Sequence, residues 1–90
     1  MKKYLIEREI PGVHQLGGAD LCGAAAKSNE ALAQLAPKVQ WVQSYVTPDK
    51  TFCVYLAENE DVVREHARIS GFPANRISEV TGMIDPTTAG

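Results

Sequence analysis

The sequence predicts a ferredoxin-like α+β domain with the element order β-α-β-β-α-β. Three observations support it: an alternating strand pattern near the N-terminus, two apolar stripes at helical spacing, and a hairpin centred on Pro48-Asp49-Lys50. Right-handed crossovers place both helices on one face of a four-stranded antiparallel sheet in this arrangement. The other face of the sheet is then left open.

The first strand is expected over residues 4–10, where side chains alternate between the two faces. One face receives Tyr4, Ile6 and Ile10, and the other receives Leu5, Glu7 and Glu9. Pro11-Gly12 ends this strand. The first helix is expected over residues 21–36, because Asp20 can cap its start and Pro37 cannot continue it.

The hairpin strands are expected over residues 39–47 and 51–58. Asn59 can cap a second helix, which Gly71 and Pro73 end. A last strand is expected over residues 77–84. The sequence thus predicts a single domain over residues 1–86 and a flexible tail over residues 87–90.

Both faces of the hairpin are apolar. Phe52, Val54 and Leu56 point to one side of the second hairpin strand, while Cys53, Tyr55 and Ala57 point to the other. One apolar face can be covered by the helices of this chain, so the other needs a partner. We therefore expect a homodimer that packs through the open sheet face, with Trp41 and Tyr45 on one side of their strand, lining the core or the dimer interface.

Composition excludes two classes of partner. The 90 residues carry a formal net charge of −2, so there is no basic surface of the kind that binds nucleic acid. No apolar run is long enough to span a bilayer, and Glu7, Arg8 and Glu9 interrupt any secretory signal. We expect a cytoplasmic protein. No GxSxG, P-loop, GxGxxG, HExxH or zinc-ribbon pattern is present, so enzymatic activity stays open, and no catalytic residue is assigned.

Several residues are candidate metal ligands. His66 lies in the apolar stripe of the second helix, and His14 lies in a loop. If Phe52, Val54 and Leu56 face the helices, the open face brings together Glu7, Cys53, Tyr55 and Glu79. Such a cluster could bind a metal, through Glu7 and Cys53, or a small polar ligand, and Tyr55 and Glu79 would line the cavity or the dimer interface. Imidazole, thiolate and carboxylate groups suit a divalent transition metal. The structural alternatives are a hydrogen-bonded core histidine for His66, a solvated His14 and simple interface packing for the cluster.

Four segments resemble a family of small bacterial domains of unknown function: residues 4–8, 44–55, 64–67 and 70–77. A structurally described member of that family is a nickel-binding homodimer with a ferredoxin-like fold, thought to sequester nickel. The resemblance therefore implies that this chain binds nickel for sequestration or tolerance.

Two other functions remain open at this point. Dimeric α/β barrels resemble this arrangement and include small-molecule binders and cofactor-free enzymes that use a cavity at the open sheet face. In such a protein His66, Tyr55 and Glu7 would be the acid–base candidates. The third possibility is a module that binds another protein through an exposed apolar face.

Overall fold

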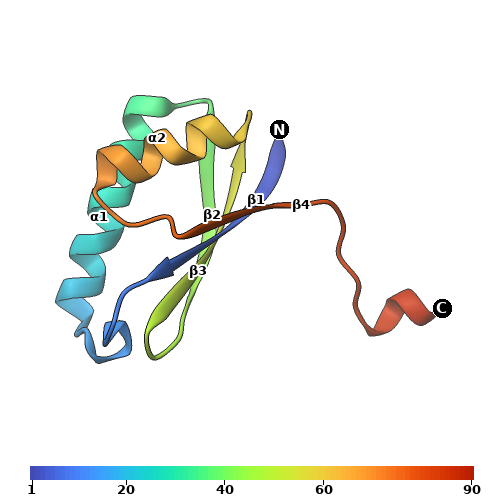
Figure 1. The fold of residues 1–90 in the computed structure, drawn as a ribbon, viewed down its shortest axis with the longest axis horizontal. Coiled ribbons are helices and arrows are strands. Elements are labelled where there is room, and N and C mark those ends of the chain that lie inside the picture. Colours follow the sequence, from blue (N-terminus) through green and yellow to red (C-terminus); the bar gives the residue numbers. More distant parts are fainter.

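A computed structural model describes residues 1–90, and it has the predicted order of strands and helices (Figure 1). The elements are β1 (Lys2–Glu9), η1 (Val13–Gln15), α1 (Gly18–Leu35), β2 (Val39–Val46), β3 (Lys50–Ala57), α2 (Glu60–Ser70), β4 (Arg76–Val80) and η2 (Pro86–Ala89), where η marks a short 3-10 helix. No helix is long and apolar enough to cross a membrane.

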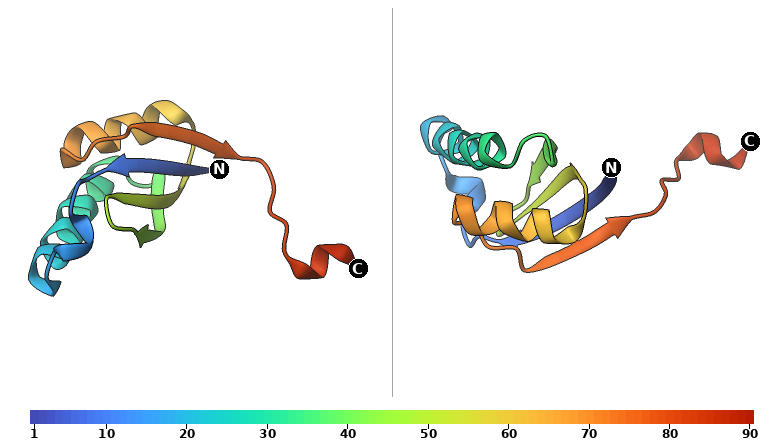
Figure 2. Two further views of the ribbon diagram at one scale, coloured as in Figure 1. Left: turned by 60° about the horizontal axis from the view of Figure 1, so that its bottom comes forward. Right: turned by 90° about the horizontal axis from the view of Figure 1, so that it is seen from above.

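The four strands form one sheet in the order β2-β3-β1-β4, with every neighbouring pair antiparallel. Both helices lie on the same side of this sheet (Figure 2). The ferredoxin-like prediction is therefore confirmed for the single chain. The opposite side of the sheet carries no helix, and we call it the open face.

Local signals place α2 where the sequence predicts it. The Asn59 side chain accepts a hydrogen bond from the Val62 amide at 3.0 Å, which satisfies one free donor of the first turn. Gly71 ends the helix with a φ of 79°, a left-handed conformation that glycine adopts without strain. The first helix starts three residues earlier than expected, at Gly18, and Asp20 lies inside its first turn instead of capping it.

The strand register reverses the expected faces of the hairpin. Ile6 pairs with Cys53, and Tyr4 pairs with Tyr55, so these four side chains share a face. All four are at least 95% buried beneath the helices. The prediction that Cys53 and Tyr55 lie on the open face was therefore wrong. The open face instead receives Leu5, Phe52, Val54, Leu56 and Val80.

A β-bulge in β2 separates Trp41 from Tyr45. The register shifts between Trp41 and Gln43, which inserts one unpaired residue and inverts the alternation beyond it. Trp41 pairs with Tyr55 on the helix side, whereas Tyr45 pairs with Phe52 on the open face and is 58% exposed. The expectation that the two aromatic residues share a face was thus incorrect.

The C-terminal segment leaves the body of the domain. β4 ends at Val80, so residues 81–84 do not extend the last strand as expected. The chain then runs away from the sheet to η2 (Figure 1). Met83 and Ile84 on this segment are 80% and 83% exposed. We call residues 81–90 the C-terminal arm.

Candidate functional site

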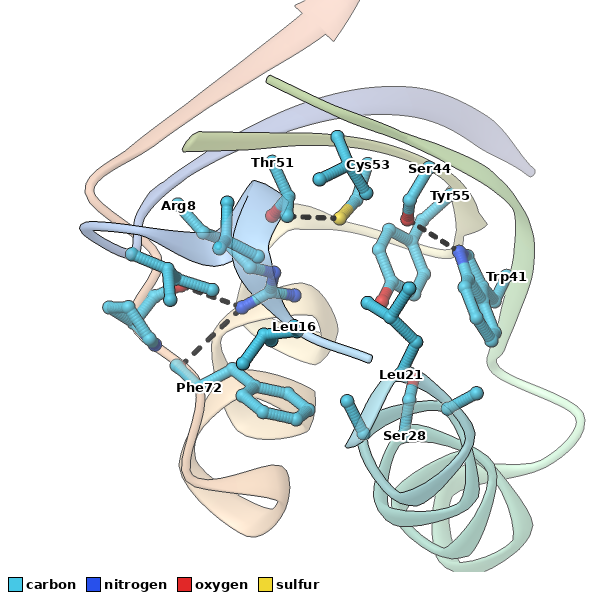
Figure 3. Close-up of a pocket in the computed structure, with 16 residues that line it drawn as sticks. Arg8, Leu16, Leu21, Ser28, Trp41, Ser44, Thr51, Cys53, Tyr55 and Phe72 are labelled. Atoms are coloured by element: carbon cyan, nitrogen blue, oxygen red, sulfur yellow. Dashed lines mark hydrogen bonds between the residues drawn. The ribbon is translucent and has the colours of Figure 1, made fainter. Parts of the chain in front are cut away.

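A cavity of about 410 Å³ lies between the N-terminal half of α1 and the helix-covered face of the sheet (Figure 3). This volume is within the usual range of small-molecule sites. Ala24 and Ala25 of α1 face it, and their small side chains leave the space unfilled. Eleven of its sixteen lining residues are hydrophobic, so the cavity suits an apolar molecule.

Arg8 is the one charged residue that lines the cavity. It follows Tyr4 and Ile6 on the helix side of β1, and it is only 2% exposed. Its Nη1 donates to the carbonyl of Pro73 at 2.7 Å and lies 3.5 Å from the carbonyl of Phe72. Its Nη2 is buried and has no hydrogen-bond partner. No Asp or Glu lines this cavity, so the positive charge is uncompensated.

Tyr55 lines the cavity, and His66, which does not line it, packs against the Tyr55 ring. Their ring centroids are 5.0 Å apart, and His66 Nε2 lies 3.2 Å from the Ser28 hydroxyl. Burial raises the pKa of Tyr55, against the smaller opposing effects of Ser28 and Arg8, so its phenol stays protonated at neutral pH. Burial, reinforced by the charge of Arg8, lowers the pKa of His66. Both rings are therefore neutral at physiological pH.

The four residues of the expected cluster do not meet. Glu7 is on the open face, where Lys50 and Arg76 lie 3.8 and 3.9 Å from its carboxylate. Cys53 is on the other side of the sheet, with its thiol 3.6 Å from the Thr51 hydroxyl. Glu79 pairs with Tyr4, so it also lies on the helix side instead of the expected open face, at an exposed strand end beside Lys2. No three His, Cys, Asp or Glu side chains of the chain are placed to hold one metal ion.

The two histidines differ in access. His66 is 1% exposed, and its Nδ1 is buried without a partner, so it is a core residue that a metal ion cannot reach without local opening. His14 is exposed, and its Nδ1 lies 2.8 Å from the carbonyl of Pro48. A carbonyl only accepts, so Nδ1 carries the proton and Nε2 keeps its lone pair. Ligating histidines are commonly oriented by such a bond.

Arg8 was not among the residues that sequence reasoning selected, because arginine is rarely buried without a partner. The alternation of β1 nonetheless contained the signal. Residues 4, 6 and 8 have the same parity, so a strand that buries Tyr4 and Ile6 must also direct Arg8 toward the helices.

Comparison with known proteins identifies the relatives of this chain. The family model described as nickel responsive protein SCO4226-like matches residues 4–80. The fold is similar to a crystal structure of SCO4226 from Streptomyces coelicolor A3(2), with a TM-score of 0.77 and 15% identity over 91% of this chain and 99% of that chain. No curated protein shows significant similarity to the chain. The resemblance seen in the sequence is confirmed, and the chain belongs to the SCO4226-like family of nickel responsive proteins.

Proposed function

We propose that this protein is a homodimer that binds Ni²⁺ and acts in nickel sequestration or tolerance. The observation that carries the proposal is the match of residues 4–80 to a family of nickel responsive proteins. Titration of the purified protein with Ni²⁺, alongside a His14→Ala variant, tests it.

His14 is the residue of this chain that best fits one position in a nickel coordination shell. Its Nδ1 proton is held by the Pro48 carbonyl, so Nε2 is left to ligate, and imidazole is a good ligand for Ni²⁺. The structure supplies no chelating group of three ligands within the protomer. The proposal therefore needs water and side chains of a second protomer to complete the shell.

The open face supports the homodimer. Its central side chains, which include Leu5, Val54 and Leu56, are apolar and only half-buried in the protomer. Apolar sheet faces of this kind are covered by another layer in stable proteins. The C-terminal arm adds Met83 and Ile84, whose side chains are largely exposed in the single chain. A second protomer would cover both surfaces.

The cysteines are consistent with a cytoplasmic location. Cys22 is exposed and Cys53 is buried, and both are free thiols. Free cysteines are ordinary in a reducing compartment, whereas secreted domains of this size commonly use theirs in disulfides.

The cavity favours a second candidate function, the binding of a small molecule. The sequence placed such a cavity at the open face, but the cavity of the protomer lies on the other side of the sheet, beneath α1. The cavity fits binding better than catalysis, because two of the three acid–base candidates do not line it. Glu7 lies on the other side of the sheet, and His66 is buried behind the Tyr55 ring. A molecule bound beneath α1 would not compete with a nickel ion at His14.

A further inference from the structure

The buried charge of Arg8 requires an explanation. A guanidinium group cannot lose its proton at physiological pH, so burial cannot neutralise it as it neutralises a buried lysine or histidine. Buried charges in proteins are normally paired, because removing an ion from water costs several kcal/mol. None of the ion pairs in this structure includes Arg8.

The compensation that the protein itself offers is incomplete. The Pro73 carbonyl accepts one strong hydrogen bond from Nη1. The Tyr55 ring lies 5.9 Å from the Arg8 Cζ, at the outer limit of a cation–π contact. Neither group carries a negative charge, and Nη2 still has no partner. The chain therefore supplies no anionic partner for the buried charge of Arg8.

The surroundings of Arg8 indicate the rest of the ligand. The guanidinium lies at one end of the cavity, with Leu16 and Phe72 beside it and Leu21 and Trp41 farther along (Figure 3). Hydroxyl groups of Tyr55, Ser28 and Thr51 also line the cavity and can donate to an anion. The remaining wall is mainly apolar. One negative group at the Arg8 end and an apolar body along α1 would match this distribution.

We propose that the cavity beneath α1 binds a small amphipathic carboxylate, whose carboxylate pairs with Arg8 and whose apolar body lies against Leu21, Ala25 and Trp41. The proposal deepens the second candidate function and rests on it. It is independent of nickel binding at His14. Leu16, on the connection between η1 and α1, also lines this end of the cavity and is 38% exposed.

The test uses octanoate and, as an uncharged match, 1-octanol. Trp41 is the only tryptophan of the chain and lines the cavity, so its emission reports entry of either molecule. A charge-assisted pair should make octanoate bind on the order of 10- to 100-fold more tightly than octanol. Arg8→Met should remove that difference, and Arg8→Lys should retain part of it. Ala25→Phe fills the cavity and should abolish the binding of both molecules.

Three outcomes would contradict parts of the account. Equal affinities of the wild-type protein for octanoate and octanol would overturn carboxylate recognition and leave small-molecule binding standing. No saturable change with either molecule would overturn both. If Arg8→Met does not fold, the pKa of bound octanoate, measured by NMR with ¹³C at its carboxyl group, tests the pairing with Arg8 in the wild-type protein. A lowered pKa of the bound carboxyl supports pairing with Arg8, and an unshifted pKa overturns it.

Discussion

The Ser28 hydroxyl on α1 lies 3.2 Å from Nε2 of His66 on α2, in the buried region where the two helices meet. His66 is thereby part of the protein core. The groups that face it are the neutral Tyr55 ring and the positive charge of Arg8, and neither favours an imidazolium ion. This environment has a measurable consequence for stability.

Stability should fall on acidification because of His66. Its folded-state pKa lies below the ordinary 6.5, so at low pH the unfolded chain binds a proton that the folded chain excludes. The contribution is complete above the unfolded pKa and is lost as the pH falls through the lower folded pKa. The slope from this one group can be at most about 1.4 kcal/mol per pH unit. Urea unfolding at several pH values between 7.5 and 5 measures it. His66→Gln should flatten the curve, and an unchanged slope in that variant would assign the effect to other groups.

A charge at the centre of the open face should break the proposed dimer. Val54 pairs with Leu5 and Gln43 there, so Val54→Lys would place an ammonium group in the apolar interface. We expect the dissociation constant of the dimer to rise more than tenfold, which corresponds to a loss of about 1.4 kcal/mol or more of association free energy. Sedimentation velocity measures this. Ala33→Lys adds the same charge to an exposed position of α1 and should leave the dimer intact. Equal behaviour of the two variants would argue against this interface.

Removal of the C-terminal arm should weaken association without unfolding the domain. Residues 81–90 contribute nothing to the sheet, and Met83 and Ile84 are exposed in the protomer. A chain ending at Val80 should therefore keep its circular dichroism spectrum. The dissociation constant of its dimer should rise about tenfold, because roughly 1–2 kcal/mol of apolar contact is lost. Loss of the native spectrum on truncation would show instead that the arm stabilises its own domain.

The two thiols should react at very different rates. Cys22 is exposed, whereas Cys53 is 5% exposed and lies beneath the helices. Under native conditions an aromatic disulfide reagent should modify one thiol per chain rapidly. Cys22→Ser should then react only as fast as the protein unfolds. Rapid reaction of that variant would mean that Cys53 is accessible, and that the helix side of the sheet opens readily.

Local signals in the sequence determined much of this fold. Asn59 and Gly71 mark the two ends of α2 through contacts within a few residues, and Pro48 and Asp49 set the turn after β2. These features depend on local sequence, so they could be predicted. The face of β3 could not, because Phe52, Val54 and Leu56 are as apolar as Cys53, Tyr55 and Ala57. Their orientation depends on pairing with β1, which is distant in sequence.

The candidate site was harder to predict for a related reason. The bulge in β2 leaves no clear mark on the sequence, and it decides that Trp41 lines the cavity while Tyr45 faces solvent. The cavity itself depends on the spacing between α1 and the sheet, which no local pattern specifies. Trp41 and Tyr55 were expected at a cavity or dimer interface and do line the cavity, although on the side of the sheet opposite to the one expected for Tyr55, and Arg8 could have been found from the alternation of β1.

The proposed nickel function is tested most directly by calorimetric titration of the tag-free protein with Ni²⁺ at neutral pH. The account predicts saturable binding at a fixed stoichiometry per dimer, which His14→Ala removes or greatly weakens without lowering the free energy of unfolding. His66→Ala is the matched control: it should cost about 2–4 kcal/mol of stability through loss of a buried side chain and leave nickel binding unchanged in the folded fraction. Saturable binding that survives His14→Ala, or no binding above that of a denatured control, would contradict the proposed site.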